Sequence, residues 1–96
     1  MKIQELLKHA QKAQQSLQEQ LARLEVEGRA GGGLVVVRLN GLKELKTVTF
    51  DPEVFSQADP ELLGEMVKVA WEEAAREVDA KARGLLAAMG LPGGLV

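Results

Sequence analysis

Five basic side chains near the two ends of the chain are the residues best suited to bind another molecule. They are Lys2, Lys8, Lys12, Lys81 and Arg83. Residues 1–14 hold one acidic side chain, Glu5, and residues 80–89 hold none, whereas residues 59–79 hold seven against two basic ones. Lysine and arginine contact phosphates without reading base sequence, so basic ends would suit duplex DNA. Charge alone favours the simpler interpretation that these cations only solvate helix surfaces.

Other groups that could do chemistry are few. The chain has no cysteine and a single histidine, His9, so a metal site lacks ligands. Gly31-Gly32-Gly33 precedes a strand pattern and not a helix, which argues against a phosphate-binding loop. Four acidic residues within 72–79 lie on one helical pattern with no pocket expected to shift their pKa values. We therefore expect no enzyme activity, no cofactor, no metal and no small-molecule substrate.

Composition indicates one globular domain over residues 1–96. Hydrophobic residues make up 46% of the chain and charged residues 27%, which is not the balance of a disordered segment. Aromatic residues are only 3%, so the core must be aliphatic. No apolar run approaches the roughly 18 residues of a membrane span, and no secretory leader is recognisable. We expect a cytoplasmic protein without membrane contact.

Two long helical patterns must position the basic residues. The first covers residues 1–24, where side chains in the seam of a heptad repeat alternate spacings of four and three. The seam consists of Ile3, Leu7, Ala10, Gln14, Leu17, Leu21 and Leu24. Asp59-Pro60-Glu61 is a strong helix start, which predicts a second helix over 60–89. Gly90 is a natural C-cap, and residues 90–96 form a short tail.

The stretch between the helices predicts a three-stranded antiparallel meander over residues 25–50. Gly31-Gly32-Gly33 favours a sharp reversal, and Asn40-Gly41 fits a two-residue hairpin turn with positive φ at both central positions. Residues 34–39 between them are apolar and β-branched on both faces, which predicts a central strand covered on both sides. The whole chain is therefore α+β, in the order α-β-β-β-α.

Polar residues of the strands have two possible uses. Arg38 lies on the second face of the central strand, and Lys46 on the third strand is its candidate neighbour. They could contact DNA at the base of the helices, or they could pair with Glu25 and Glu27; we prefer ion pairing. After the sheet, residues 53–58 form a short connection whose Val54 and Phe55 are expected to tuck against it.

The lengths of the elements favour a homodimer. A 30-residue helix is about 45 Å long at 1.5 Å per residue, whereas a strand of six residues spans about 20 Å. The helical stripes can pair with each other, but part of their apolar surface stays uncovered in one copy. We expect the dimer interface among Leu34, Val36, Val48, Phe50 and Trp71.

These residues, in this order, resemble the YbaB/EbfC family of bacterial nucleoid-associated proteins. The resemblance is carried by a Gln-rich first helix, Leu24-Glu25-Val26-Glu27-Gly28, Gly31-Gly32-Gly33-Leu34-Val35-Val36-Val37, Asn40-Gly41, Val48-Thr49-Phe50-Asp51-Pro52, and a last helix with Leu63, Glu65, Met66, Val67, Ala70, Trp71, Ala74 and Ala75. One departure is that Glu72-Glu73 follows Trp71 where the family commonly has Asn, which places negative charge beside the aromatic ring.

The resemblance implies a tweezers-like homodimer in which helices project from a shared β core. It also implies binding of double-stranded DNA with little sequence specificity in the cytoplasmic nucleoid. We further expect bridging or bending of DNA and an influence on gene expression. On this hypothesis the basic helix ends straddle the duplex. The alternative is a non-enzymatic interaction scaffold whose long helices recruit a partner protein.

Overall fold

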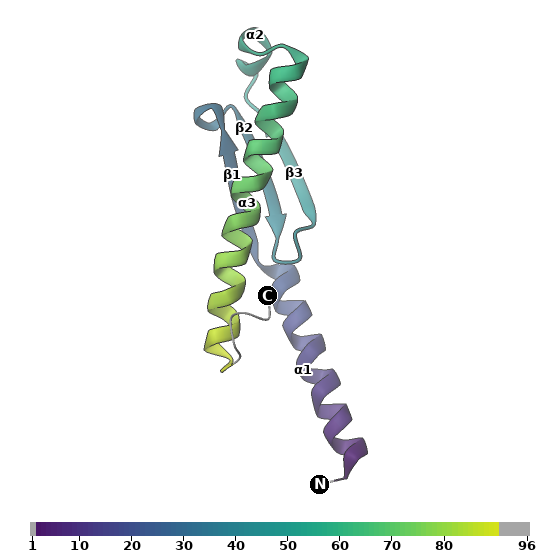
Figure 1. Cartoon of the computed structure of the whole chain (residues 1–96). Helices are drawn as coiled ribbons and strands as arrows, with labels where there is room; N and C mark the ends of the chain where they lie inside the picture. The colour runs from purple at the N-terminus through teal and green to yellow at the C-terminus, as the bar shows by residue number, and fades with distance from the viewer. Residues whose placement is uncertain (1, 91–96) are drawn as a thin grey trace.

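The computed structural model describes residues 2–90 and has the expected α+β order (Figure 1). Its elements are α1 (Ile3–Arg23), β1 (Glu25–Ala30), the 3-10 turn η1 (Gly31–Gly33), β2 (Val35–Asn40), β3 (Leu45–Phe50), α2 (Val54–Gln57) and α3 (Pro60–Ala88). The predicted helices and meander are confirmed, and α2 is a single helical turn inside the predicted connection. Met1 and the part of the expected tail beyond Gly90 lie outside the described residues.

The sheet is antiparallel in the order β1-β2-β3, and the glycine turn joins its first two strands. Gly31, Gly32 and Gly33 have φ values of 62°, 69° and 100°, which only glycine adopts without strain. The predicted reversal at these residues is confirmed.

The second turn is built differently from the prediction. Four residues, 41–44, separate β2 from β3, and the positive φ of 61° belongs to Lys43 and not to Gly41. The Asn40 side chain organises this loop, because its Oδ1 accepts from the Leu42 and Glu44 amides at 2.9 and 3.0 Å. The expected two-residue Asn-Gly turn is therefore wrong, because Asn40 acts through its side chain as a loop cap.

Gly41 instead permits contact between this loop and α1. Its N–H donates to the Leu21 carbonyl oxygen at 2.8 Å, and a Cβ on Gly41 would lie only 2.5 Å from that oxygen. Residue 41 therefore fixes the end of α1 against the hairpin.

The core lies between α3 and one face of the sheet. Val26, Gly28 and Ala30 of β1 alternate with exposed residues, as the sequence predicts for a strand with one covered face. Ala70 and Ala74 of α3 are fully buried against this face. A Cβ on Gly28 would overlap the Ala70 carbonyl oxygen and lie 2.5 Å from the Ala74 nitrogen. Small residues thus let the α3 backbone rest directly on β1.

The opposite face of the sheet is open in one chain. Register places Arg29, Val36 and Thr49 side by side, and Arg38 beside Thr47. Arg29, Arg38 and both threonines are exposed, and Val36 is only half-buried. Coverage of the central strand on both sides is therefore wrong for the single chain, because α3 covers one face only (Figure 1).

Helix α1 leaves the sheet as a separate rod (Figure 1). No residue of α1 is buried, and Ile3, Leu6 and Leu7 are 76, 59 and 55% exposed. The expected pairing of the two helical stripes does not occur within one chain, because α3 buries its small residues on the sheet while α1 passes straight into β1 at Leu24. The molecule consequently measures 65 × 19 × 17 Å.

The connection between β3 and α3, residues 53–58, is partly as predicted. Val54 is fully buried, but Phe55 is 63% exposed and touches only the Phe50 ring among the aromatic side chains, at 5.8 Å between centroids. The expectation that Phe55 tucks under the sheet is wrong, because one helical turn points only one of the two adjacent side chains inward. Asp59 caps α3 as predicted, accepting from the Leu62 amide at 2.8 Å. Within residues 2–90, neither long helix is apolar enough to cross a membrane.

Candidate nucleic-acid interface

The five predicted basic residues lie on two helix ends that project from the same end of the sheet (Figure 1). Lys2 precedes the first turn of α1, Lys8 and Lys12 lie on α1, and Lys81 and Arg83 lie near the end of α3. All five are exposed. The three ion pairs within residues 2–90 involve other side chains, so none of the five is neutralised there.

Helical spacing decides which of these cations can act together. Lys8 and Lys12 are four residues apart and therefore lie on the same face of α1, one turn from each other. Lys81 and Arg83 are two residues apart and point to opposite sides of α3. A single duplex beside the helix ends would therefore meet the α1 pair together, but only one of the α3 cations.

Acidic residues outnumber basic ones along the rest of α3. All seven acidic side chains of residues 59–79 belong to this helix or its N-cap, and Asp79 pairs with Lys43 of the hairpin loop at 2.9 Å. Negative charge along the body of α3 repels phosphate, so the far end of the helix is better suited to an anionic polymer than its body.

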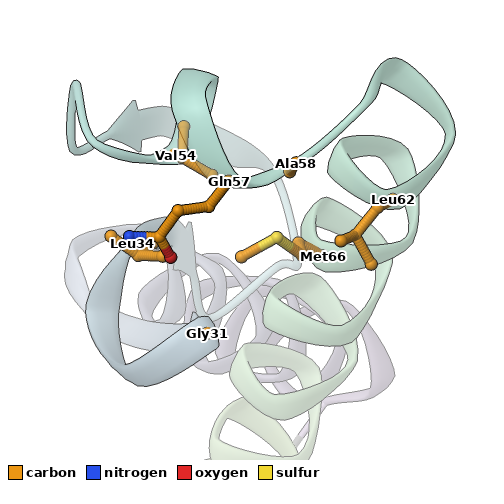
Figure 2. A pocket seen from close by; sticks show the side chains of 7 residues that line it. All are labelled: Gly31, Leu34, Val54, Gln57, Ala58, Leu62 and Met66. Atoms are coloured by element: carbon orange, nitrogen blue, oxygen red, sulfur yellow. The ribbon is translucent and has the colours of Figure 1, made fainter.

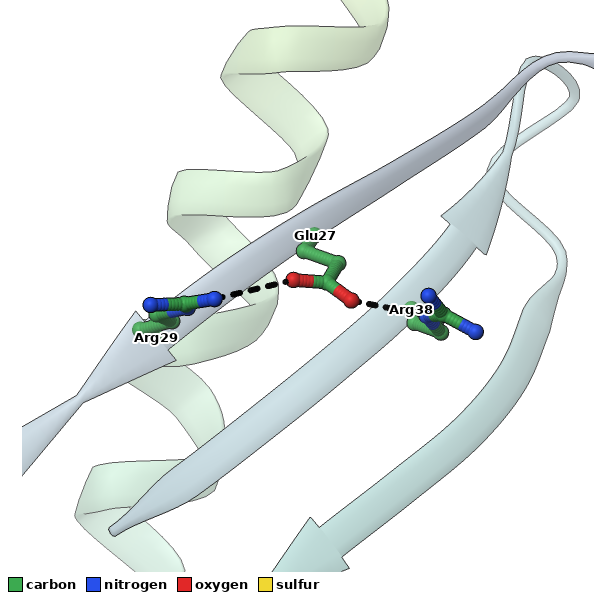
Figure 3. A network of polar contacts seen from close by, with 3 residues as sticks. All are labelled: Glu27, Arg29 and Arg38. Carbon is green, nitrogen blue, oxygen red and sulfur yellow. Dashed lines mark hydrogen bonds and ion pairs between the residues drawn. The ribbon is translucent and has the colours of Figure 1, made fainter. Parts of the chain in front are cut away.

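The open sheet face carries a second group of charges (Figure 3). One Glu27 carboxylate binds two arginines, accepting from Arg38 Nε at 2.9 Å and from Arg29 Nη2 at 3.3 Å. The hydrogen bond from Arg38, followed by that from Arg29, lowers the pKa of Glu27. The predicted ion pairing of Arg38 with Glu27 is confirmed.

Two details of this face differ from expectation. Register sets Arg38 opposite Thr47, so Lys46 is not its neighbour across the strands. The sequence analysis did not predict the pairing of Arg29 with Glu27. The sequence did indicate it, because residues 27 and 29 of one strand share a face. Glu25 is exposed on the same face of β1, so the four charged side chains that β1 and β2 place there, Glu25, Glu27, Arg29 and Arg38, carry no net charge.

The five residues expected at a dimer interface do not lie together on one exposed surface of the chain. Leu34, Val48 and Phe50 pack against the chain's own core. Val36 lies half-buried on the open face, and Trp71 is 39% exposed on α3. Sequence reasoning did not include in the interface the exposed apolar residues of α1, among them Ile3, the most exposed large hydrophobic residue of the described part of the chain. The sequence pattern that could have indicated them is the heptad seam of residues 1–24, to which Ile3 and Leu7 belong.

These features define a class of small α+β protein in which basic helix ends project from a three-stranded sheet. A protein-family model described as the YbaB/EbfC DNA-binding family matches residues 1–94. A nucleoid-associated protein of Koribacter versatilis is 37% identical over 95 residues, covering 95% of this chain and 94% of its own. One of Xanthomonas euvesicatoria is 40% identical over 100 residues, covering 97% and 92%.

A solved structure agrees with the fold. The crystal structure of an uncharacterized protein from Helicobacter pylori superposes with a TM-score of 0.74 at 25% identity, covering 93% of this chain and 97% of that one. The chain belongs to the YbaB/EbfC DNA-binding family.

Proposed function

We propose that this chain is a non-enzymatic, nucleoid-associated protein that binds double-stranded DNA as a homodimer, with little sequence specificity. Contact is made by the basic helix ends, defined by Lys2, Lys8, Lys12, Lys81 and Arg83. The observation that carries the proposal is the separation of charge along the molecule, in a family whose relatives are named nucleoid-associated proteins. A cytoplasmic location in the bacterial nucleoid follows from it.

The mode of binding follows from the side-chain chemistry. Exposed lysines on helix surfaces form point-charge contacts with phosphates, and these contacts supply affinity without reading bases. Because Lys8 and Lys12 are point charges on one face of α1, we expect them to contact the phosphates of any base sequence alike.

A second copy would cover the apolar side chains that α1 exposes in one chain. Most helical stability in proteins comes from packing of an amphipathic face, and α1 has no buried residue in one chain. Burying Ile3, Leu6 and Leu7 against a second copy would stabilise α1 and double the number of basic helix ends. Two sets of ends suit bending of one duplex or bridging of two, through which the protein would influence gene expression.

Gel-shift titration of unrelated duplexes over a range of salt concentrations tests this function. We expect similar affinity for each duplex and a straight fall of log affinity with log salt, with a slope of about −0.9 per phosphate neutralised. Absence of binding at low salt, or affinity that does not depend on salt, would contradict the proposal.

Charge-reversed variants locate the contact. We expect the pair K8E and K12E to weaken every duplex alike by at least about tenfold and to reduce the salt slope by about 3.6, since two phosphate contacts are lost per chain and four per dimer. The pair K46E and K68E is the matched control, because it changes net charge equally at exposed lysines away from the helix ends. Equal losses in both pairs would show that only net charge matters.

The alternative is an interaction scaffold whose long helices recruit a protein. The exposed apolar stripe of α1 is the observation that favours it. A stoichiometric protein partner that remains bound after nuclease treatment, and that is lost on Leu7→Gln, would support this function over DNA binding.

A further inference from the structure

An apolar cavity lies at the end of the molecule away from the basic helix ends. It has a volume of about 320 Å³ and opens between η1, α2 and the first turns of α3 (Figure 2). Its lining consists of Gly31, Leu34, Val54, Gln57, Ala58, Leu62 and Met66. Gln57 is the only polar side chain among them, so the cavity is suited to an aliphatic or aromatic group.

The cavity has a fixed base and an adaptable wall. Val54 is fully buried, and the Met66 methyl group lies so close to Gly31 that a Cβ there would overlap it. Methionine side chains adjust to irregular partners at low cost, so Met66 can shift as a side chain enters. Leu62 is 49% exposed at the edge, and Phe55, on the same short helix as Val54, is 63% exposed. Of these two, only Leu62 belongs to the lining, and it adds apolar surface at the opening.

Four of the seven lining residues, Val54, Gln57, Ala58 and Leu62, come from a chain segment, residues 51–65, that is acidic. Residues 51–65 contain no lysine or arginine, and their five acidic side chains are all exposed. These are Asp51, Glu53, Asp59, Glu61 and Glu65. Asp51 and Asp59 each accept one backbone hydrogen bond, which holds their carboxylates in place without neutralising them. An occupant of this site must therefore carry positive charge around its apolar anchor.

We propose that this cavity docks a short basic amphipathic segment of a partner protein, with one apolar side chain in the cavity and Lys or Arg side chains against the acidic rim. Nucleic acid is disfavoured here, because the exposed acidic side chains of residues 51–65 repel phosphates. Symmetric contact between the same ends of two copies is disfavoured for the same reason, since it would gather ten carboxylates. The protein would then hold DNA at one end and a basic protein segment at the other, along its 65 Å length.

The direct test is fluorescence polarisation with three labelled peptides of 12 residues. The first places leucines at helical spacing i, i+3, i+4 and i+7 with lysine elsewhere, the second replaces its lysines by glutamates, and the third replaces its leucines by alanines. We expect the first to bind the full chain and the other two to bind at least about tenfold more weakly, because each lacks one half of the recognition.

Matched variants tie binding to the cavity. We expect Leu62→Gln to weaken the first peptide about tenfold, whereas Val69→Gln should leave it unchanged. Val69 is 48% exposed on the same helix but does not line the cavity, so both variants remove the same kind of exposed apolar side chain. Likewise E61Q with E65Q should weaken the peptide, and E72Q with E73Q should weaken it less, since the second pair lies outside the rim.

Three results would overturn the proposal. These are equal losses for Leu62→Gln and Val69→Gln, binding of the glutamate peptide as tight as that of the lysine peptide, and absence of peptide binding. If Leu62→Gln also lowers the sedimenting mass of the protein, the cavity is a contact between copies, and docking of a separate partner is wrong. DNA affinity of Leu62→Gln should equal that of the unchanged chain, so failure here is distinguishable from failure of DNA binding.

Discussion

At the scale of single residues, Glu27 is the side chain with the most evident electrostatic role. Its carboxylate lies between Arg29 and Arg38 on the open face of the sheet and joins β1 to β2 (Figure 3). All three side chains are more than a third exposed, so solvent screens these pairs, and they orient the arginines more than they stabilise the fold.

The lowered pKa of Glu27 gives a prediction with a definite sign. Because the folded pKa lies below the unfolded one, the contribution to stability is present above the ordinary glutamate pKa and disappears as pH falls through the folded value. We expect an NMR titration of the Glu27 side-chain carbonyl carbon to show a midpoint below the ordinary glutamate range. Arg38→Ala should raise this midpoint more than Arg29→Ala, because the Arg38 bond is the larger cause.

A control separates this effect from general charge. Arg76→Ala removes one exposed cation on α3 and should leave the Glu27 midpoint in place. A midpoint that does not respond to Arg38→Ala would contradict the ion pair.

At the scale of secondary-structure elements, the close approach of α3 to β1 determines the core. The helix lies directly on the strand because Gly28 has no side chain and Ala70 and Ala74 have small ones. Larger residues at these positions would lift α3 off the sheet and expose Val37 and Leu39, which are fully buried beneath it.

Two glycine substitutions test this packing in opposite directions. We expect Gly28→Ala to destabilise the protein by about 1–3 kcal/mol or more, because its Cβ overlaps α3 backbone atoms that cannot move independently. Gly64→Ala should instead stabilise it by about 0.5–1 kcal/mol, because a Cβ meets no atom there and alanine favours the helix. Urea unfolding at one fixed protein concentration measures the change in unfolding free energy of both variants. Destabilisation by Gly64→Ala would show that another surface covers residue 64.

Sequence reasoning predicted these elements well and one turn incorrectly. The helix start at Asp59 and the glycine reversal followed from local backbone chemistry, which operates in any context. The Asn40-Gly41 turn did not, because the close approach of α1 to the hairpin gives Gly41 a different use. That approach brings together residues 20 positions apart, and local patterns carry no signal for it.

At the scale of the whole molecule, the exposed stripe on α1 is the main feature still without a partner. The described chain spans 65 Å because α1 packs against almost nothing, and its apolar residues face solvent in one copy. A contiguous row of uncovered apolar side chains commonly marks an interaction surface, which is why we propose a homodimer.

Leu7→Gln tests whether a second copy covers this stripe. Because a buried leucine contributes about 1.5–3 kcal/mol and the change occurs twice per dimer, we expect the dimer dissociation constant to rise at least about a hundredfold. Analytical ultracentrifugation over a concentration series measures it. His9→Gln, an exposed change on the same helix, should leave dimerisation unaltered, and a monomer at all concentrations in the unchanged chain would refute the homodimer.

The sequence by itself determined the order of elements, the helix caps, the buried alternation of β1 and the basic and acidic segments, because each depends on residues close together along the chain. Only the tertiary structure decided that one sheet face stays open, that Glu27 holds two arginines, that α1 stands apart from α3, and that an apolar cavity forms at the acidic end. These features depend on how elements cross in space. That crossing is set by the fit of small residues such as Gly28 and Gly41 against distant backbone, which no local pattern encodes.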